Sequence, residues 1–561
     1  MPSDRIQGFQ IPFISMSEQG TLSQKTGMWG RIRPFLSERP APCQKGCPAG
    51  IPIPRVLGYL QEKRFEEAVQ SIRLENPLPR ITGRVCFHPC EENCHRQNFD
   101  QSLSIRGLER FLSEYTSPKL QKREQNGKKI AVIGSGPAGL SSSYYLALLG
   151  YHVTLFEEEK SLGGMLGFGI PEYRLPKEIL SREIEEILSF GIEPIVGIRI
   201  GRDLSFDTIY RDYDSIFVAT GAWKSQKMGV PEEEAQGVIP ALHFLKELNR
   251  GRRPAIGRNV LVVGGGNSAF DAARTALRMG AQVKMAYRRS REEMPAIQEE
   301  IEEAIEEGIQ ILFLTSPVRI VIKNKKVVGV ECVRNQLTGP GEDGRAIPVP
   351  IQGSNYVSEV DTLLAAVGES PDLSIFSLGV QLKGDRLQTG EKVLEKVFLG
   401  GDLLLQPRTV IHAIQSGKEG AIRIDQYLRN GRRLEGTPWT TLTAYQKGEL
   451  EIQGPPVKFE ELNMSYFDHQ DRLIQEKLHV ETRKGNFEEV NRSISEGSAI
   501  QEAKRCFQCG TCTICKNCYI FCPDFIVSIG EKVTIDYDYC KGCCICVEEC
   551  PRGVMMAEIK F

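Results

Sequence analysis

Sulfur ligands for iron dominate the chemistry that this sequence could carry. Six cysteines fall between Cys506 and Cys522. A step of three residues followed by proline occurs in this stretch only from Cys518 to Cys522, which fixes the frame of a C-x2-C-x2-C-x3-C-P motif. Its ligands are Cys512, Cys515, Cys518 and Cys522, so Cys506 and Cys509 are left over.

The same spacing returns near the end of the chain. Its cysteines are Cys540, Cys543, Cys546 and Cys550, and Pro551 follows. Two such motifs predict two [4Fe-4S] clusters, in which the fourth cysteine of each motif ligates the cluster of the other. Zinc also binds C-x2-C pairs, but zinc sites typically use separated pairs, so the repeated spacing favours four-iron clusters.

The composition limits the class of protein. The chain has 561 residues, 41% of them hydrophobic and 25% charged, with a net charge of -2. These values predict several packed domains and no nucleic-acid partner. Because no basic start leads into an apolar core and no eighteen-residue apolar run occurs, we expect a cytoplasmic protein without a membrane span. In a reducing compartment, the 17 cysteines are better explained as metal ligands than as disulfides.

A dinucleotide-binding pattern begins at KIAVIGSGPAGLSSSYYLALLGYHVTLFEEE, which predicts a strand, a Gly-rich turn, a helix and a second strand. Its glycines allow a pyrophosphate to approach the helix N-terminus, and Glu157 is placed to bind a ribose. Downstream, ATG and GD fit the return of the chain to this domain, with Asp402 near a ribityl-phosphate group. The predicted binding residues are Gly134, Gly136, Pro137, Ala138, Gly139, Glu157, Thr220, Gly221, Gly401 and Asp402.

The pattern recurs at NVLVVGGGNSAFDAARTALRMGAQVKMAYRRS, between the two halves of the first fold. This order is expected when a nicotinamide-binding domain is inserted into a flavin-binding domain. The second strand ends in Arg288 and Arg289, where an NAD-specific fold commonly has an acidic residue. Guanidinium groups suit a 2′-phosphate, which favours NADPH over NADH, although arginines can also simply decorate a strand end. The predicted binding residues are Gly264, Gly266, Asn267, Ser268, Arg288 and Arg289.

Three stretches, VTLFEEEKSLGGMLGFGIPEYRLPK, GGGNSAFDAARTALRMGA and YRRSREEMPA, resemble the small subunit of bacterial glutamate synthase and its relatives. These relatives are the flavin and iron-sulfur subunit of NADH-dependent ferredoxin:NADP oxidoreductase and the N-terminal half of dihydropyrimidine dehydrogenase. The resemblance implies FAD at the first fold and NAD(P)H at the second. It places Gly163 to Pro171, with Gly164 and Met165, near the flavin ring, and it implies two [4Fe-4S] clusters in the N-terminal region.

The chain departs from the relatives in where its cysteines lie. Relatives begin with E-A-x-R-C-x-x-C, whereas this chain has no cysteine before PAPCQKGCPAG and carries EAKRCFQC at Glu502 to Cys509. By the resemblance, the ligands of one cluster are Cys47, Cys86, Cys90 and Glu109. Those of a second are Cys43, Cys94, Cys506 and Cys509. A glutamate on a helix is otherwise usually a solvated side chain.

The ligand count then reaches sixteen, enough for four clusters: eight cysteines of the C-terminal motifs, five N-terminal cysteines, Cys506, Cys509 and Glu109. Cys332 and Cys544 remain, and we interpret both as small hydrophobic residues. The predicted fold is multidomain α/β, with two nested Rossmann-like domains. The predicted domains are a helical [4Fe-4S] domain (1–125), an FAD-binding domain in two parts (126–222 and 366–431), an NAD(P)H-binding domain (223–365), a connector (432–500) and a two-cluster ferredoxin-like α+β domain (501–561).

These parts predict a subunit that exchanges a hydride between NAD(P)H and FAD and single electrons between FAD and the clusters. No catalytic acid or base is required. The expected partner is a larger metalloenzyme subunit, such as a glutamate synthase large subunit-like or aldehyde oxidoreductase-like protein, or a free ferredoxin, which predicts a hetero-oligomer. Alternatives are a glutamate synthase small subunit, from which the ferredoxin tail departs, and a cluster-carrying scaffold. A thioredoxin-reductase-type enzyme would need a redox C-x-x-C pair close to the flavin, and this chain has no such pair between Cys94 and Cys506.

Overall fold

The computed structural model describes residues 25–116, 120, 122–341, 344–376, 380–383, 386–389, 392–404, 407–429 and 454–559. The chain forms two compact units. The first comprises Met1–Pro42, Ile452–His469 and Phe507–Phe561, and the second Cys43–Glu451 and Gln470–Cys506. The N-terminal stretch, residues 1–24, for which we expect no leader lies outside the described residues, as do residues 430–453, which include the first part of the predicted connector.

Five parallel strands form the sheet of the first dinucleotide fold, in the order β20-β5-β2-β3-β4. The strands are β2 (Lys129–Ile133), β3 (His152–Glu157), β4 (Glu193–Val196), β5 (Ser215–Val218) and β20 (Val397–Leu399). Near-continuous apolar runs such as those of β2 and β5 suit a parallel sheet covered on both faces. The helices of this fold are α7 (Pro137–Leu148), α8 (Met165–Phe168), α9 (Lys177–Leu188), α10 (Phe206–Asp212) and α14 (Val410–Leu428).

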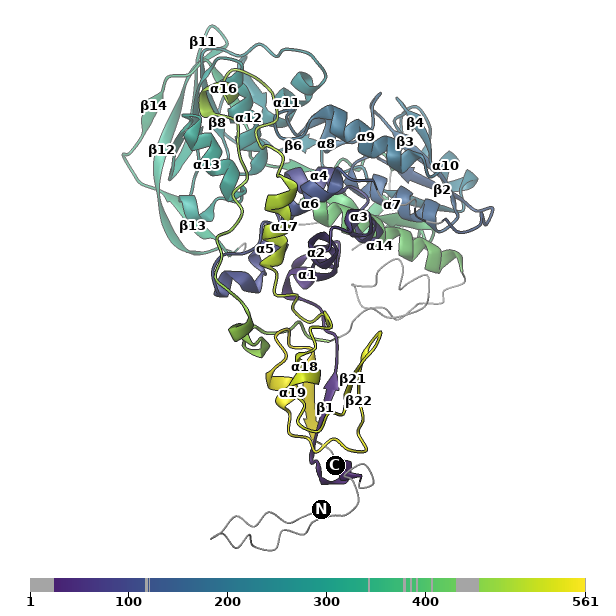
Figure 1. The fold of residues 1–561 in the computed structure, drawn as a ribbon. Coiled ribbons are helices and arrows are strands. Elements are labelled where there is room, and N and C mark those ends of the chain that lie inside the picture. Colours follow the sequence, from purple (N-terminus) through teal and green to yellow (C-terminus); the bar gives the residue numbers. More distant parts are fainter. Residues whose placement is uncertain are drawn as a thin grey trace, which may run out of the picture. The chain divides into compact units, whose positions relative to one another are not determined.

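Helices α7 and α14 pack closely because Gly417 has no side chain. A Cβ at Gly417 would come within 2.2 Å of the Ala138 carbonyl oxygen. The two helices lie side by side in Figure 1. This contact brings the start of α14, which follows Gly401 and Asp402, to the start of α7, which follows the first Gly-rich turn.

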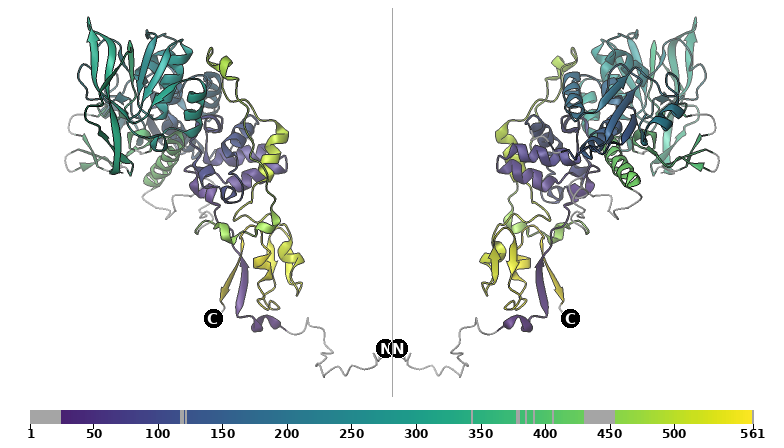
Figure 2. Two further views of the ribbon diagram at one scale, coloured as in Figure 1. Left: turned by 90° about the vertical axis from the view of Figure 1, so that its left-hand side faces the viewer. Right: turned by 90° about the vertical axis from the view of Figure 1, so that its right-hand side faces the viewer.

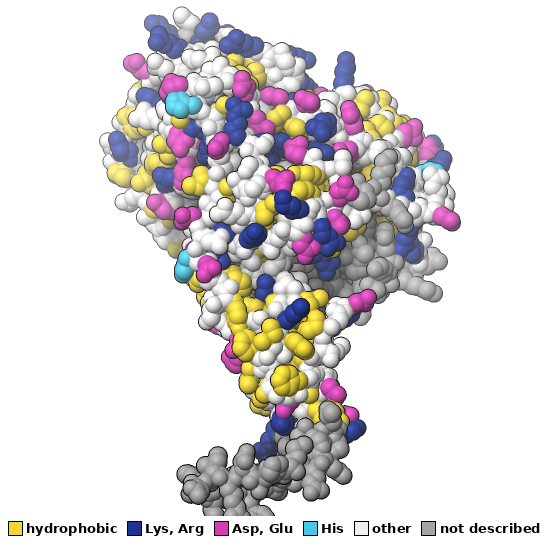
Figure 3. Space-filling view, in the orientation of Figure 1, with side chains coloured by type: hydrophobic (Ala, Val, Ile, Leu, Met, Phe, Trp, Pro, Cys, Tyr) yellow, Lys and Arg dark blue, Asp and Glu magenta, His cyan; other side chains and the backbone are white. Residues whose placement is uncertain are grey.

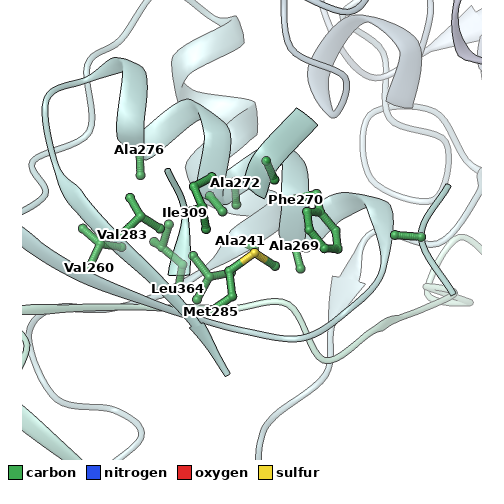
Figure 4. Packing of buried hydrophobic residues seen from close by; sticks show 14 of the residues in the cluster. Ala241, Val260, Ala269, Phe270, Ala272, Ala276, Val283, Met285, Ile309 and Leu364 are labelled. Carbon is green, nitrogen blue, oxygen red and sulfur yellow. The ribbon is translucent and has the colours of Figure 1, made fainter. Parts of the chain in front are cut away.

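The second dinucleotide fold repeats the parallel arrangement, in the strand order β10-β9-β8-β15-β7. Its strands are β7 (Val238–Pro240), β8 (Asn259–Val263), β9 (Gln282–Ala286), β10 (Gln310–Leu312) and β15 (Thr362–Ala365), and its helices are α11 (Ala241–Asn249), α12 (Asn267–Arg278) and α13 (Gln298–Glu306). Phe270 on α12 and Met285 on β9 pack with Leu364 on β15 in its core (Figure 4).

An antiparallel sheet extends this second fold (Figure 1). It contains β11 (Thr315–Lys323), β12 (Lys326–Pro340), β13 (Ala346–Pro350) and β14 (Tyr356–Ser358). A two-stranded antiparallel pair, β6 (Lys224–Ser225) with β16 (Glu369–Ser370), accompanies both crossings of the chain between the two folds. The remaining strands of this unit are β17 (Val380–Lys383), β18 (Arg386–Thr389) and β19 (Lys392–Val393).

Short helices precede the first fold. They are α1 (Pro42–Gly46), α2 (Ile53–Gln61), α3 (Phe65–Glu75), α4 (Pro79–Val85), α5 (Pro89–Glu92) and α6 (Ile105–Ser113). The later segment with α16 (Val480–Arg483) and α17 (Glu496–Lys504) returns to them, and the Gln61 side-chain amide donates to the Ala503 carbonyl at 2.7 Å. The same segment contacts the second dinucleotide fold, where the Lys477 ammonium lies 2.9 Å from the Glu303 carboxylate.

The first unit combines both ends of the chain. Strand β1 (Ile32–Leu36) pairs antiparallel with β23 (Met555–Ile559), and Figure 2 shows the purple and yellow strands side by side. The other elements are α18 (Asn517–Ile520), α19 (Ile545–Glu548) and the hairpin of β21 (Val527–Ile529) and β22 (Val533–Ile535). Residues 25–42 thus belong with the C-terminal segment and not with the helices that follow them. Among the described helices, none has the length and apolar character needed to cross a membrane.

Candidate functional site

The first dinucleotide fold contains a cavity at the carboxyl ends of its strands. Of the residues predicted for this fold, those lining the cavity are Gly134, Gly136, Pro137, Ala138, Glu157, Gly164, Met165, Thr220, Gly221, Gly401 and Asp402. Gly139 is not in the lining. It packs inward instead, where a Cβ would come within 1.8 Å of the Gly134 carbonyl oxygen. The segments that sequence patterns join into one site therefore surround one cavity.

Two glycines of the first turn serve different needs. A Cβ at Gly134 would lie 2.4 Å from the Ala219 carbonyl oxygen, and the φ of Gly134 is +101°, so only glycine fits. Gly136 has no other atom within 4 Å of its Cβ position. Because Gly136 lines the cavity, this open space is a cradle where a pyrophosphate can approach the backbone at the start of α7.

The polar groups of this cavity fit FAD. The Glu157 carboxylate accepts hydrogen bonds from the Ser135 backbone N–H at 3.0 Å and the Ser135 hydroxyl at 2.6 Å, which fix its position beside the turn. Asp402 Oδ1 and Thr220 Oγ1 are buried without a hydrogen-bond partner. Burial raises the pKa of Asp402 to about 6. Buried polar atoms require partners, and the hydroxyl groups of a ribityl chain can supply them.

The second dinucleotide fold has its own cavity. It is lined by Gly264 and Gly266 of the turn and by Arg288 and Arg289 after β9. As in the first fold, a Cβ at Gly264 would meet a backbone oxygen, that of Ala366, at 2.3 Å, while Gly266 has open space. The predicted residues Asn267 and Ser268 start α12 outside the lining, and Asn267 Oδ1 accepts a hydrogen bond from the Ile297 N–H at 3.0 Å.

The two predicted arginines differ in their surroundings. Arg288 is exposed at the cavity, whereas Arg289 is 5% exposed and its Nε donates to the Ala346 carbonyl at 2.7 Å. A third arginine, Arg345, lines the same cavity from the turn before β13. The described residues that line it include no Asp or Glu. Such a cation-rich lining fits the phosphates of a nicotinamide dinucleotide.

A cavity among the N-terminal helices is lined by four predicted ligands, Cys47, Cys86, Cys90 and Glu109. The remainder of its lining is apolar, including Ile53, Leu57, Ile72, Leu108 and Leu112. Cys47 follows α1, Cys86 follows α4 and Cys90 lies in the first turn of α5, while Glu109 lies on α6. The donor set of three thiols and a carboxylate fits a four-iron cluster.

Glu109 is buried and held in place by hydrogen bonds. Its Oε1 accepts from the Asn76 side-chain amide at 2.9 Å and from the Thr82 hydroxyl at 2.8 Å. Burial raises the pKa of Glu109 to about 7 and that of Cys47 to about 11. Ligand groups with such values need a positive centre to be held ionised, and iron supplies one. Helix α6 approaches α4 at Gly83, where a Cβ would come within 2.6 Å of the Arg110 backbone.

Three ligands of the other predicted N-terminal cluster belong to the second unit: Cys43, Cys94 and Cys506, all of them buried. Gly46, at the end of the helix that carries Cys43, abuts Asn93, since a Cβ there would contact the Asn93 side chain at 2.6 Å. Arg96 donates to the Arg505 carbonyl at 3.1 Å, which ties the residue before Cys506 to the segment after Cys94. Cys509 belongs to the first unit, and its place in this cluster remains a prediction from the sequence.

In the first unit, one cavity is lined by Cys512, Cys515, Cys518 and Cys550. These are the first three cysteines of one motif and the last of the other, which is the exchange expected of a two-cluster ferredoxin. For the complementary set, burial raises the pKa of Cys540, and the neighbouring charges of Cys543 and Cys522 raise it further. Cys546 is buried, and the charges of Cys543 and Cys540 act on its pKa in the same direction after burial.

No group of three or more His, Cys, Asp or Glu side chains in the described residues converges as a single metal ion would require. The ligands of a [4Fe-4S] cluster instead surround the cluster, and the predicted ligands surround each of the two cysteine-lined cavities in the same way. Cys332 is fully buried, and burial raises its pKa to about 11, which suits an inert core residue. Cys544 is half-buried beside Cys543 and lies outside the lining of these cavities.

Some residues of these cavities have no strong sequence signal. Trp223 lines the first cavity, its ring packs edge-on against Phe168, and the Lys246 ammonium lies 4.6 Å from its centroid. The Asn249 side-chain amide donates to the Phe168 carbonyl at 2.9 Å, so a hydrogen bond joins α11 of the second fold to α8, which follows Gly164. Arg345 also lines a cavity, that of the second fold, without a sequence signal that points to it. An isolated Trp and an arginine after a Gly-rich turn are common in loops, so their types alone indicate no site.

Two dinucleotide cavities in nested Rossmann-like folds and a cysteine-lined cavity among the preceding helices define an NAD(P)H-dependent flavin oxidoreductase with an iron-sulfur domain. The chain belongs to the pyridine nucleotide-disulphide oxidoreductase family, whose profile matches residues 128–417. The profile described as dihydropyrimidine dehydrogenase domain II, 4Fe-4S cluster, matches residues 36–120. FAD, NAD(P)H and a [4Fe-4S] cluster are thus among its cofactors, and the predicted total of four clusters stays a prediction.

Similar proteins agree with the predicted resemblance. NADPH-Fe(3+) oxidoreductase subunit beta of Geobacter sulfurreducens is 38% identical over 519 residues, which cover 85% of this chain and 76% of the relative. NADP(+)-dependent formate dehydrogenase subunit beta of Moorella thermoacetica is 38% identical over 512 residues, covering 85% of this chain and 71% of the relative. Glutamate synthase [NADPH] small chain of Escherichia coli is 33% identical over 419 residues, covering 69% of this chain and 88% of the relative.

Proposed function

We propose that this chain is the NADPH-oxidising or NADP-reducing subunit of a larger cytoplasmic complex and carries electrons through four [4Fe-4S] clusters. Bound FAD supplies the conversion between a two-electron hydride and single electrons. The cavity lined by Cys512, Cys515, Cys518 and Cys550 carries the proposal, because it adds a ferredoxin-type site to a flavin oxidoreductase that is otherwise complete.

The proposed path follows the cysteines. The set of Cys47, Cys86, Cys90 and Glu109 is taken as nearest to the flavin, and the ferredoxin pair as the exit. Ligands of consecutive sets are close neighbours in the sequence: even in a fully extended chain, Cys509 and Cys512 lie within roughly 11 Å of each other and Cys43 and Cys47 within roughly 15 Å. These short tethers would hold neighbouring clusters close.

The first unit also supports a partner. Hydrophobic side chains gather on its visible surface in Figure 3. Its exposed apolar residues include Ile514, Tyr519, Ile520, Phe521, Phe525 and Ile545. Cys515 and Cys543 are themselves exposed, so clusters at these sites have short routes to the surface. A partner metalloenzyme subunit or ferredoxin that covers this surface could accept or donate electrons.

A glutamate synthase small chain is a second candidate function, because the match covers 88% of that relative's length. Its match covers 69% of this chain, and the ferredoxin-type unit has no use in a chain that hands electrons on directly from the N-terminal clusters. Several relatives are named as beta subunits, including those of an iron reductase and a formate dehydrogenase, which favours an exchangeable redox partner.

The purified holoprotein tests the proposal directly. We expect about sixteen iron atoms and one FAD per chain, because four clusters need about four iron atoms each. Serine in place of Cys515 should remove about four of these iron atoms, leave flavin reduction by NADPH unchanged and stop reduction of an added partner. Cys544→Ser is the matched control and should change neither value. An iron content near eight in intact protein would contradict the four-cluster assignment.

A further inference from the structure

The cavity of the second dinucleotide fold contains a cation that comes from a distant part of the chain. Arg345 lines this cavity together with Arg288, Arg289, Thr315 and Ser316. We infer that Arg345 binds the 2′-phosphate of NADPH alongside Arg288, and that Arg289 acts mainly as the residue that positions Arg345. The inference rests on the proposed use of NADPH.

Arg345 is held by the segment that follows β9. The Arg289 Nε donates to the carbonyl of Ala346 at 2.7 Å, and the Ala346 N–H donates to Glu293 Oε1 at 2.7 Å. Tyr287 completes the connection, because its hydroxyl donates to the Glu293 carbonyl at 2.7 Å. Both backbone polar groups of the residue after Arg345 are therefore bonded to the 287–293 segment, so little conformational freedom is lost when a ligand binds.

The two sheets that supply the arginines are also joined directly. The Asn335 amide on β12 donates to the Arg288 carbonyl at 3.0 Å and to the Ser316 hydroxyl at 2.8 Å. The Leu314 N–H donates to the Arg289 carbonyl at 3.1 Å. Arg288, which follows β9 of the parallel sheet, and Arg345, which precedes β13 of the antiparallel sheet, thus belong to one hydrogen-bonded wall. This gives the antiparallel sheet, for which the sequence indicates no role, a part in cofactor binding.

The charge of this wall selects among dinucleotides. Among the described residues that line the cavity are the cations Lys227, Arg288, Arg289 and Arg345 and no Asp or Glu; Lys227 pairs with Glu234 outside the lining. NADPH adds a phosphate at the ribose 2′ position, where NADH has only a hydroxyl. Guanidinium groups bind phosphate through charge-assisted and often bidentate hydrogen bonds, so each correctly placed arginine favours NADPH and leaves NADH nearly unaffected.

The experiment compares the holoprotein with Arg345→Gln, Arg345→Lys and Arg319→Ala. Arg319 is the matched control, because it lies on the same antiparallel sheet, pairs with Glu331 and is outside the cavity. Two readouts are used: kcat/KM for flavin reduction by NADPH and by NADH, and binding of 2′,5′-ADP compared with 5′-AMP. The second readout needs no turnover and isolates the 2′-phosphate.

With Arg345→Gln, we expect the NADPH value to fall about tenfold and the NADH value to stay within about twofold. Binding of 2′,5′-ADP should weaken to the same extent while that of 5′-AMP does not. Arg345→Lys should recover part of the loss, since it restores the charge without the forked geometry. Arg289→Ala should reproduce the loss more weakly, by releasing the turn that carries Arg345.

The outcomes separate this inference from the proposed function. A parent protein that prefers NADH defeats the assignment of NADPH itself, whatever the variants do. A parent that prefers NADPH, combined with an Arg345→Gln variant that keeps the same preference, overturns the role of Arg345 alone. Equal losses for NADPH and NADH also overturn it, because they show that Arg345 supports a part of the site that both nucleotides share.

Discussion

The two dinucleotide folds share their glycine geometry and differ in the charges that they present. In both turns the first glycine, Gly134 or Gly264, is required because a Cβ would meet the backbone oxygen of the residue that follows the neighbouring strand. In both, the last glycine of the turn, Gly136 or Gly266, leaves open space at the start of a helix. The first cavity is lined by three carboxylates and one arginine, Arg199, whereas the described lining of the second has three arginines and no carboxylate.

This difference teaches which part of the pattern specifies the cofactor. The turn provides backbone N–H groups and a helix N-terminus, which bind any pyrophosphate. The side chains beyond it decide the rest. Glu157 and Asp402 suit the hydroxyl groups of a ribose and a ribityl chain, while Arg288 and Arg345 suit a phosphate. One turn geometry can therefore serve a flavin in one domain and a nicotinamide dinucleotide in the other.

The largest expected effect separates the two turns. Gly136 has φ −67° and Gly266 has φ −89°, so valine can adopt either backbone without strain, but its side chain would fill the cradle. Gly136→Val should weaken FAD binding, whereas Gly266→Val should retain FAD and weaken NADPH binding. Each effect should reach up to about a hundredfold, since overpacking costs about 1–3 kcal/mol. Flavin content and the rate of flavin reduction measure the two effects.

Gly530→Val is the control for this pair. Gly530 is an exposed residue of the first unit between β21 and β22, and only the Lys532 carbonyl oxygen, at 3.9 Å, lies within 4 Å of its Cβ position. We expect it to change neither flavin content nor NADPH reduction. Loss of FAD from Gly266→Val would break the comparison, because the second turn would then act on the first cavity.

Much of this comparison was predictable from the sequence, because the signals are local. Spacing fixes which glycines turn the chain, and the two C-x2-C-x2-C-x3-C-P motifs fix a frame whose members Cys512 and Cys550 line one cavity. Local spacing carries no information on Arg345, which reaches the second cavity through pairing of β12 with β13. The pairing of β1 with β23 is likewise a long-range contact, which an N-terminal segment read by itself does not indicate.

A second, intermediate effect tests the charges directly. Arg288→Gln should reduce kcat/KM for NADPH about tenfold with little change for NADH, since one charge-assisted contact contributes about 1.5 kcal/mol. Glu157→Gln should leave the nucleotide preference unchanged and increase FAD release, because its carboxylate also fixes Ser135 in the turn. A change in nucleotide preference with Glu157→Gln would show that the two cavities are not electrostatically independent.

The smallest effect concerns pH and the acid of the first cavity. Burial raises the pKa of Asp402 to about 6, and the neighbouring Arg408 partly opposes the shift, while burial also raises the pKa of nearby Glu369. A raised pKa means that the empty folded site holds a proton that the unfolded chain, with a pKa of about 3.9, releases more easily. The ionised carboxylate is thus disfavoured in the folded site above pH 6, and that cost is absent below about pH 4.

A ribityl hydroxyl donates more strongly to the ionised carboxylate than to the protonated acid. FAD affinity should therefore follow the ionised fraction, constant above about pH 7 and about tenfold lower at pH 5 than at pH 7.5, because the proton competes with the hydroxyl. The Asp402→Asn variant should bind FAD more weakly at pH 7.5, and its FAD affinity should not fall with pH. The Glu369→Gln variant should keep the pH-dependent fall. Fluorescence titration of deflavinated protein at pH 7.5, 6 and 5 measures this. An unchanged pH dependence in Asp402→Asn would assign the titration to another group and leave the first cavity without its proposed ribityl contact.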